Sequence, residues 1–340
     1  MRVLVVKTSS LGDLIHTLPA LTDAAAARPG IRFDWVAEEA FAEVPAWHPV
    51  VDRVIPIALR RWRREWWRSL RTGAVRRFLS DLQRTDYDVV IDAQGLLPKS
   101  AWVACRARGA SWGYGPGSAR DPFASLCYRH RVGVPRDLHA IDRIRRLFAA
   151  ALGYTAPETE PDYGLRFDGE RGPGRPALLF LHGTSWPSKH WPDPYWVALA
   201  QRASEEGYAV HWPWGDEKEQ QRAERLIAAS HSGWLLPHLS LTQIAKTLAG
   251  AAGAVGLDSG LAHLAAAVGT PAVTLYGPTR TDLTGARGEH QYNMQADFPC
   301  APCMKKECAY EGDRPVDPPC FQTLPPDKVW RRLKHQMGAV

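Results

Sequence analysis

The chain has 340 residues, of which 45% are hydrophobic and 23% charged, and its formal net charge is +6. This length and composition suffice for two domains of ordinary size with buried cores. No apolar run approaches the length that spans a bilayer, and the N-terminus turns polar too soon for a signal peptide. We therefore expect a cytoplasmic protein, and the positive charge favours an anionic partner without specifying it.

Strands and helices alternate through the first part of the chain. This alternation is typical of a parallel, doubly wound α/β sheet. A basic helix is expected after the third strand. The four strands are expected at 2–7, 31–37, 52–58 and 87–94. Besides the basic helix, helices are expected at 14–30, 98–109, 121–130 and 139–154.

The alternation stops and then restarts, which indicates two similar domains with a ligand cleft between them. The segment between them is rich in proline, glycine and charge, as expected of a connection. After it, strands are expected at 177–183, 208–215 and 233–239, with helices at 191–207, 216–230 and 240–251. The predicted organisation is a first domain at 1–155, a linker at 156–176, a second domain at 177–322 and a closing helix at 323–340, for which packing back onto the first domain is one option.

The segment 251–277 predicts a strand, a loop, a short helix and a second strand. Asp258 ends the first strand, and Ser259 is well suited to cap the helix that follows. A helix start presents unpaired N–H groups and positive dipole charge, and it would lie at the carboxyl edge of the sheet. We interpret it as a phosphate site. The alternative is that Ser259 only caps the helix and Asp258 only ends the strand.

A second candidate loop, 182–192, follows the first strand of the second half. It combines Thr184, Ser185 and Lys189, and two hydroxyls with an ammonium suit a diphosphate. Further on, Glu219 falls in the first turn of a helix, where it could accept hydrogen bonds from ribose hydroxyls. A glutamate in contact with solvent is the alternative for that position.

The first loop of the chain, KTSSLGDLIHTLPAL, leaves the first strand and enters a helix near Asp13. It is neither a P-loop nor a GxGxxG loop. One interpretation is that Asp13 faces the cleft and takes a proton during catalysis. The other is that it is an ordinary acidic residue at a helix start, where the helix dipole favours it.

The segment 60–77 is rich in arginine and tryptophan. Nucleic acid is a conceivable partner, but no recognised nucleic-acid motif is present. An anionic lipid surface fits as well, because arginine pairs with phosphate and tryptophan favours the membrane interface. The third interpretation is a solvated helix that turns one tryptophan face towards the core.

The C-terminal tail contains a CxxC pair and two further cysteines, within CAPCMKKECAYEGDRPVDPPC. Four thiols suit a tetrahedral zinc or iron site, so a structural metal is one interpretation. Four reduced thiols in a surface loop are the alternative, and disulfides are disfavoured in a cytosolic protein. The residues concerned are Cys300, Cys303, Cys308 and Cys320.

Taken together, these stretches resemble the bacterial heptosyltransferases of lipopolysaccharide core synthesis, and most closely the heptosyltransferase I type. The resemblance extends to about residue 278. It rests on KTSSLGDLIHTLPALTDA, FDWVAEE, RVIPIALRRWR, YDVVIDAQGL, KSA, SARDPFASLCY, KHWP, PWG and LDSGLAHLAAAVGTPAVTLYGPT. It implies the GT-B fold, with two Rossmann-like domains facing a cleft. It also implies an inverting, metal-independent transfer of L-glycero-D-manno-heptose from ADP-heptose to Kdo-lipid A.

Carried over by position, the resemblance makes Asp13 the general base. Lys189 would stabilise the leaving diphosphate together with the amides at the start of the helix, with no cofactor required. The acceptor would bind the first domain and the nucleotide sugar the second. The resemblance places the phosphates at Thr184, Ser185 and Lys189, the ribose at Glu219, the adenine near Leu239, and the nucleotide sugar at Asp258, Ser259, Gly260 and His263.

The acceptor that the resemblance implies is an anionic lipid, which gives the arginine-rich segment a role. Arginine binds carboxylate and phosphate in a fork, and the segment follows the third strand, at the carboxyl edge. We therefore expect the protein to act on the cytoplasmic face of the inner membrane, with no nucleic acid partner. The predicted acceptor-binding residues are Arg60, Arg61, Arg63, Arg64 and Arg120.

Two rival functions stay open on the sequence. One is the second heptosyltransferase or another ADP-heptose transferase. The other, of a different class, is a non-catalytic protein that binds a nucleotide sugar or nucleic acid, as the high pI of about 9.0 and the basic segment would allow. Asp13 discriminates between the classes, because a pure binding protein would not require a base in that loop.

Overall fold

The computed structural model describes residues 1–65, 67, 71–169 and 174–338. The chain divides into two compact units, Met1–Leu165 and Arg166–Val340. This division falls inside the range 156–176 that the composition marks as the connection. Each unit is a parallel six-stranded sheet with helices on both faces, so the expected α/β fold of two doubly wound domains is confirmed.

The sheet of the first unit has the strand order β3-β2-β1-β4-β5-β6. Its order reverses between β1 and β4, which pair in parallel from Val3–Val89 to Val6–Asp92. Open α/β sheets bind ligands at such a reversal, beyond the carboxyl ends of the strands. The strands are β1 (Arg2–Val6), β2 (Arg32–Glu38), β3 (Val51–Ile57), β4 (Asp86–Asp92), β5 (Arg108–Tyr114) and β6 (His130–Val132).

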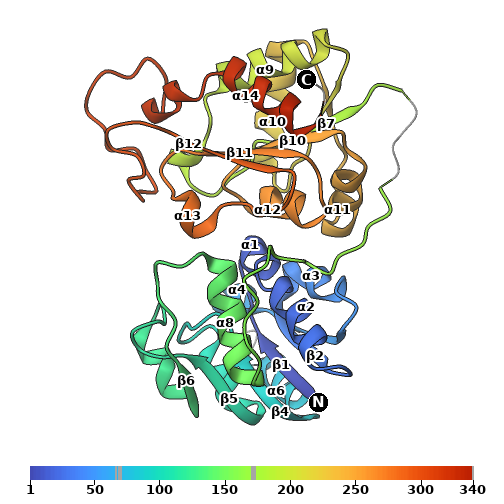
Figure 1. Ribbon diagram of the computed structural model, residues 1–340, viewed down its shortest axis with the longest axis vertical. Coiled ribbons are helices and arrows are strands. Elements are labelled where there is room, and N and C mark those ends of the chain that lie inside the picture. The colour runs from blue at the N-terminus through green and yellow to red at the C-terminus, as the bar shows by residue number, and fades with distance from the viewer. Residues whose placement is uncertain (66, 68–70, 170–173, 339–340) are drawn as a thin grey trace. The chain divides into compact units, whose positions relative to one another are not determined.

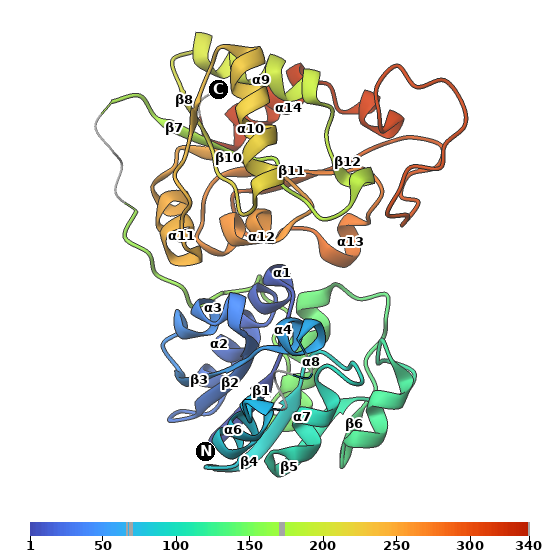
Figure 2. The same ribbon diagram turned by 180° about the vertical axis from the view of Figure 1, so that it is seen from behind.

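Helices cover both faces of this sheet, with α2 and α8 together on one face and α6 and α7 on the other (Figures 1 and 2). The sheet is therefore apolar on both sides, and Val3 to Val6 of β1 are fully buried. The helices are α1 (Leu11–Ile15), α2 (Leu18–Ala27), η1 (Glu39–Phe41), α3 (Glu43–Ala46), α4 (Leu59–Arg64), α6 (Ala74–Leu82), α7 (Ala101–Arg106), η2 (Pro122–Cys127) and α8 (Ala140–Leu152).

The second unit repeats the design with the strand order β12-β11-β10-β7-β8-β9. Its order reverses between β7 and β10, so the loops that follow these two strands share one edge of the sheet. The strands are β7 (Ala177–Leu181), β8 (Ala209–Trp212), β9 (Trp234–Leu235), β10 (Gly253–Leu257), β11 (Ala272–Tyr276) and β12 (Gln291–Gln295).

One face of the second sheet carries a core built around tryptophans, in which Trp191, Trp196 and Trp212 pack edge to face. Helices α9, α10 and α14 contribute to this core, while α11 and α12 pack together. The helices are η3 (Pro187–Lys189), α9 (Asp193–Glu205), α10 (Glu217–Ser230), α11 (Leu241–Gly250), α12 (Gly260–Ala267), α13 (Thr281–Thr284), η4 (Pro319–Thr323) and α14 (Pro326–Gln336).

The C-terminal helix α14 belongs to the second unit, whereas the sequence left open that it packs back on the first. Val329, Trp330 and Leu333 form its apolar face and are buried in the tryptophan-rich core. The Trp330 indole donates to Glu206 at 2.6 Å, and its ring meets the Tyr208 ring edge-on. These contacts hold α14 against the sheet of the second unit.

The basic segment is not one continuous helix. Helix α4 ends at Arg64, and α6 begins after Gly73, whose φ of 65° is left-handed and favours glycine. Residues 66 and 68–70 of the basic segment lie outside the described residues. Trp62 is half-buried and contacts Phe78 edge to face, so the expected tryptophan contact with the core is made by this residue.

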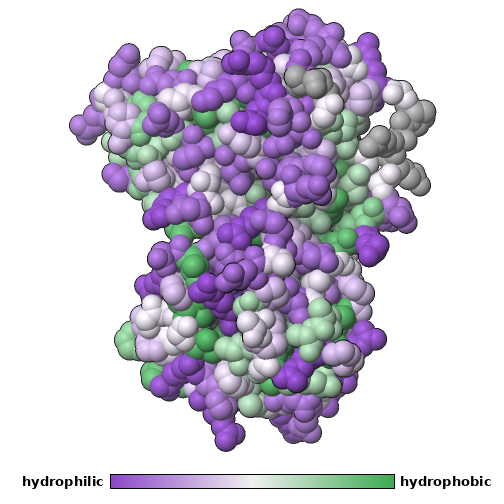
Figure 3. Space-filling view, in the orientation of Figure 1, coloured by the Kyte–Doolittle hydropathy of each residue, from purple (hydrophilic) through white to green (hydrophobic). Residues whose placement is uncertain are grey.

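The visible surface of the protein is mainly hydrophilic, with hydrophobic residues scattered among the polar ones (Figure 3). Within the described ranges, none of the helices combines the length and the apolar character needed to cross a membrane.

Candidate active site

In the second unit, the residues predicted to bind a diphosphate gather where the strand order reverses. The loop after β7 contains Thr184, Ser185 and Lys189, and the loop after the neighbouring β10 contains Asp258 and Ser259. Parallel strands bring their carboxyl ends to the same edge, so two loops far apart in the sequence meet there. Thr184 is half-buried and Ser185 is exposed.

Lys189 and Asp258 form the ion pair that joins these two loops. The Lys189 Nζ lies 2.7 Å from Asp258 Oδ2, and it also donates to the Asp258 carbonyl at 3.3 Å. His263 Nε2 lies 3.7 Å from the other carboxylate oxygen. Burial acts to raise the pKa of Asp258, but the hydrogen bond with His263 and the charge of Lys189 outweigh it and hold that pKa well below its ordinary value. Asp258 is therefore ionised at neutral pH.

Several contacts fix the loop that bears Lys189. Ser188 donates to the Lys305 carbonyl at 2.6 Å, and Lys189 Nζ lies 4.6 Å from the centre of the Trp186 ring. Arg222 of α10 donates to the carbonyls of His182 and Trp191, both at 2.9 Å. An arginine that bridges both ends of a loop restricts its motion, so the ammonium of Lys189 is held in place before any ligand arrives.

The start of α12 retains hydrogen-bonding capacity. Ser259 is the N-cap, as predicted, with extended backbone angles of −151° and 166°. Its hydroxyl makes no capping bond, and within the described residues no partner reaches this oxygen. The same is true of the Thr279 hydroxyl, which is 4% exposed and follows β11 at the same edge. A buried polar group without a partner is rare, and both hydroxyls are suited to contact a ligand.

Glu219 lies beside the loop after β7. Its carboxylate accepts from the Gly215 amide at 2.8 Å. A Cβ at Gly183 would lie 2.2 Å from Glu219 Oε1, so only glycine permits this approach. Burial, followed by the charge of Asp216, raises the pKa of Glu219. Leu239 is half-buried, and it lies between β9 and α11.

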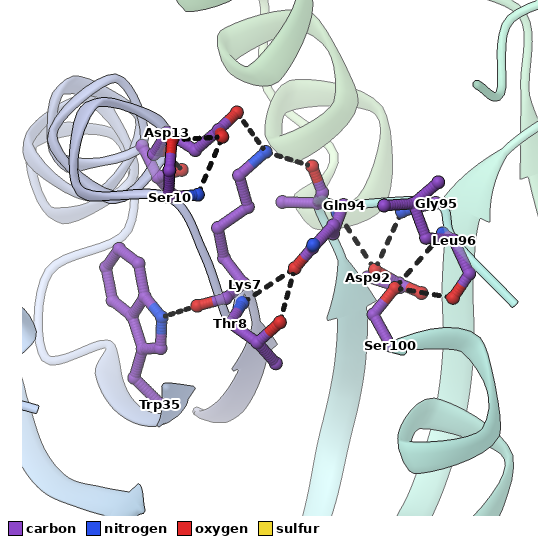
Figure 4. Close-up of polar contacts among 12 residues, drawn as sticks. Lys7, Thr8, Ser10, Asp13, Trp35, Asp92, Gln94, Gly95, Leu96 and Ser100 are labelled. Atoms are coloured by element: carbon purple, nitrogen blue, oxygen red, sulfur yellow. Dashed lines mark hydrogen bonds and ion pairs between the residues drawn. The ribbon is translucent and has the colours of Figure 1, made fainter. Parts of the chain in front are cut away.

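In the first unit, Asp13 lies in α1 immediately after β1, at the reversal of strand order (Figure 4). Its Oδ2 accepts from the Ser10 amide at 2.7 Å and from the Ser10 hydroxyl at 2.9 Å. Its Oδ1 lies 3.3 Å from Lys7 Nζ. The Asp13 side chain is 46% exposed, so its carboxylate is both fixed and open to a reactant.

Four of the five predicted acceptor arginines lie on α4, which follows β3. Arg61 makes a two-pronged ion pair with Glu39, at 3.2 and 2.9 Å, and Arg64 pairs with Glu65 at 3.2 Å. The Arg60 guanidinium lies 5.1 Å from the centre of the Phe41 ring. Arg63 is exposed on the same helix, and Arg120 is exposed in the loop between β5 and η2.

Residues 75–313 match glycosyltransferase family 9 (heptosyltransferase). The chain belongs to this family. It is 53% identical to lipopolysaccharide heptosyltransferase 1 of Pseudomonas aeruginosa, with 100% of this chain and 99% of the relative covered. Two solved Escherichia coli structures are similar, each covering 87% of this chain and 94% of theirs. Heptosyltransferase WaaC with ADP has a TM-score of 0.82 at 44% identity, and the same enzyme with ADP-2-deoxy-2-fluoro heptose has 0.79 at 43%.

The family match confirms the expected family and enzyme class. Together with the similar lipopolysaccharide heptosyltransferases, it confirms the expected heptose transfer in lipopolysaccharide core synthesis. It also decides against the non-catalytic binding protein. The structure adds residues that the sequence did not single out, namely Lys7 and Thr279. Lys7 is the first residue of the KTSSLGD motif, directly after β1, and Thr279 lies three residues after the end of β11. Their position at a strand end was a signal, but neither residue type in isolation predicts a role.

The predicted metal site at the C-terminal cysteines is not supported. Within the described ranges, no group of three or more His, Cys, Asp or Glu residues could hold a metal ion. Partial desolvation, followed by the neighbouring thiols, raises the pKa of Cys300, and burial chiefly raises the pKa of Cys320 to about 12. The four cysteines are all free: Cys300 is exposed, Cys303 and Cys308 half-buried, and Cys320 buried.

Proposed function

We propose that the protein transfers L-glycero-D-manno-heptose from ADP-heptose to Kdo-lipid A, with inversion of the anomeric centre. The observation that carries the donor assignment is the Lys189–Asp258 pair beside the start of α12. The Lys189 ammonium supplies a charged donor and the start of α12 supplies amide donors where a diphosphate would lie. The similar Escherichia coli structures contain ADP and a fluorinated ADP-heptose, which supports the same class of donor here.

The remaining donor contacts follow the order of the loops. We infer that Thr184, Ser185 and Lys189 bind the phosphates and that Glu219 binds the ribose hydroxyls, with the adenine near Leu239. The unpartnered Ser259 hydroxyl supports a contact with the nucleotide sugar, together with Asp258, Gly260 and His263.

The proposed reaction is a single displacement. Asp13 takes the proton of the acceptor hydroxyl, whose oxygen attacks the anomeric carbon of the heptose. The bond from that carbon to the diphosphate breaks, and ADP leaves with the electron pair. Lys189 and the amides at the start of α12 stabilise the charge that develops on the diphosphate, so the step requires no divalent ion.

The acceptor is proposed to bind the first unit. Kdo-lipid A carries carboxylates and phosphates, which arginine binds in a fork. Arg60, Arg63, Arg64 and Arg120 are exposed at or after the carboxyl ends of β3 and β5. Arg61 is held by Glu39 and would have to exchange this partner for the acceptor.

We also infer that the protein works at the cytoplasmic face of the inner membrane, where its acceptor lies. Phe123 and Leu126 of η2 are 69% and 72% exposed, and residues three apart on a 3₁₀ helix share one face. The Asp121 carboxylate accepts from the amides of both Phe123 and Leu97, so 42%-exposed Leu97 lies beside this face. These apolar side chains and the nearby cations suit an anionic lipid surface. The exposed cations are Lys99, Arg120 and Arg129.

The test is incubation with ADP-heptose and Kdo-lipid A, reading ADP release and the mass of the product. Asp13→Asn keeps the size of the side chain and removes its basicity, and we expect a rate loss of roughly a hundredfold or more with donor binding little changed. Near-normal turnover by this variant would exclude Asp13 as the base. Transfer only to an acceptor that already carries one heptose would identify the second heptosyltransferase instead.

A further inference from the structure

A buried lysine, Lys7, contacts the carboxylate of the proposed base Asp13. Lys7 follows β1 and is 6% exposed. Its Nζ donates to the Ala93 carbonyl at 3.0 Å and lies 3.3 Å from Asp13 Oδ1 (Figure 4). Burying an ammonium is costly unless it is paired and hydrogen-bonded. Its position is thus unlike that of an ordinary surface lysine, and its charge is directed at one oxygen of Asp13.

The two oxygens of Asp13 are held by different donors. The amide and the hydroxyl of Ser10 both bind Oδ2, whereas Lys7 approaches Oδ1. A carboxylate held at both oxygens cannot rotate about its terminal bond without breaking one set of contacts. Each oxygen accepts about two hydrogen bonds. Oδ2 is therefore saturated, and Oδ1 keeps one position for an incoming hydroxyl.

The position of Lys7 is itself determined from the neighbouring strands. The Trp35 indole of β2 donates to the Lys7 carbonyl at 2.9 Å. Gln94, which follows β4, accepts from the amide and the hydroxyl of Thr8, at 2.8 and 2.7 Å. The buried Asp92 in turn accepts from the Gln94 amide at 2.9 Å. The loops after β1 and β4 are thus joined side by side under Asp13, as Figure 4 shows.

We propose that Lys7 is a positioning residue for Asp13. Lys7 fixes Oδ1 of Asp13 towards the acceptor and keeps the carboxylate ionised until it receives the acceptor proton. This inference rests on the proposed function of Asp13. In the step, the acceptor O–H bond breaks and an O–H bond forms on Asp13. Lys7 gives up no proton, and it keeps its hydrogen bond to the Ala93 carbonyl throughout.

The electrostatics of the loop agree with this arrangement. Partial desolvation by the surrounding protein acts to raise the pKa of this half-exposed carboxyl, but the charge of Lys7 and the hydrogen bonds from Ser10 outweigh it and leave the pKa of Asp13 below its ordinary value. Loss of the Lys7 charge should therefore raise the pKa of Asp13. The other titratable or charged groups around Asp13 remain in place when Lys7 is changed. Tyr114 of β5 interacts electrostatically with Asp13, and Arg143 of α8 lies over the Tyr114 ring. His16 ends α1, and Glu43 is on α3, which packs against α1.

A double-mutant cycle on the full chain tests the inference. Lys7→Met removes the charge and retains the length of the stem. We expect kcat to fall by roughly tenfold or more, less than in Asp13→Asn, with the donor KM nearly unchanged. The acid limb of the pH profile of kcat/KM should move to higher pH. In the double variant, Lys7→Met should cause no further loss, because the base through which it acts is gone.

Two further variants complete the design. Arg108→Met removes an exposed cation of the same unit, at the amino end of β5, and should leave the rate and the pH profile unchanged. Lys7→Arg keeps the charge with a different reach, so it should retain the wild-type acid limb while kcat falls. Circular dichroism checks that each variant is folded. If Lys7→Met does not fold, Lys7→Arg carries the test, and an acid limb that moves to higher pH in this variant would overturn the inference.

The possible failures are distinguishable. If Asp13→Asn is slow and the two losses multiply in the double variant, Lys7 acts independently of Asp13, and only the positioning role is wrong. An unmoved acid limb in folded Lys7→Met would also overturn it. If Asp13→Asn turns over normally, the proposed base is wrong, and the positioning role falls with it.

Discussion

Lys189 Nζ lies 2.7 Å from Asp258 Oδ2, and the two side chains are 13% and 9% exposed. This nearly buried ion pair joins the loops that follow β7 and β10. Asp258 occupies two of the three ammonium donors of Lys189, one through its carboxylate and one through its carbonyl. Within the described residues, no further hydrogen-bond acceptor reaches this ammonium, and we propose that its third donor binds the ligand. The pair thus fixes the ammonium of Lys189 at the place where the proposed leaving group departs.

The first prediction concerns this charge. Lys189→Met keeps the stem and removes the ammonium, so ADP should bind more weakly and transition-state stabilisation should fall by about 1 to 3 kcal/mol. Calorimetric titration with ADP and the steady-state rate measure the two effects. Lys246→Met, an exposed lysine of the same unit, is the matched control and should change neither. Unchanged ADP affinity in Lys189→Met would contradict the assignment.

The second prediction concerns metal removal. Because Lys189 and the α12 amides are proposed to stabilise the diphosphate, treatment with EDTA should leave the rate unchanged. The measurement is ADP release before and after chelation, with magnesium added back as the control. A loss of activity that magnesium restores would show that the protein's own charges are insufficient for this step.

The third prediction is a pH dependence of stability at His182, which follows β7 and is fully buried. Burial, followed by the charge of Arg222, lowers its pKa to about 3, against an ordinary value of 6.5. Above pH 6.5, neither the folded nor the unfolded state binds the proton. Between pH 6.5 and about pH 3, only the unfolded state binds the proton. The free energy of unfolding should therefore fall by about 2 kcal/mol by pH 5.

His182→Phe cannot bind this proton and retains an aromatic ring against Trp212. Its free energy of unfolding should therefore decline less between pH 8 and pH 5 than that of the wild type. Urea titrations at both pH values measure the difference. His335→Phe removes an exposed histidine and should decline as the wild type does. Equal slopes for wild type and His182→Phe would exclude His182 as the source.

The sequence predicted those features of the site that are local in the chain. Asp13 and Ser10 are three residues apart, and the Ser259 cap directly precedes its helix, so each could be recognised within one motif. The Lys7–Ala93 contact joins residues 86 positions apart. It arises only because β1 and β4 are neighbours in the sheet, and strand order cannot be deduced from periodicity. The packing of α14 depends in the same way on which apolar surface is nearest in space.

The fourth prediction tests the proposed membrane surface. Phe123→Ser with Leu126→Ser removes two exposed apolar side chains and leaves the buried residues of η2 in place. Co-sedimentation with vesicles containing anionic lipid should fall, while turnover of an acceptor without acyl chains should not change. Trp234→Ser, at an exposed tryptophan of the second unit, is the control and should bind vesicles as the wild type does. Undiminished binding by the double variant would exclude this surface.

The last prediction concerns the arginines of α4. Arg60, Arg63 and Arg64 are exposed, and the Arg64–Glu65 pair is worth little at such exposure. Changing all three to alanine should raise the KM for Kdo-lipid A by roughly tenfold or more, because their forked contacts with carboxylate and phosphate are lost. The KM for ADP-heptose should barely change, since the donor is proposed to bind the second unit.

Salt provides an independent readout of the same assignment. For the wild type, the acceptor KM should rise with ionic strength, because salt screens contacts between exposed charges. The triple variant has lost these contacts, so its acceptor KM should depend less on salt. Arg61→Ala is the matched control: Glu39 already holds this guanidinium at 2.9 Å, and its loss should raise the acceptor KM less than the triple change does. If the triple variant instead lost affinity for ADP-heptose and kept it for the acceptor, the assignment of the two substrates to the two units would have to be reversed.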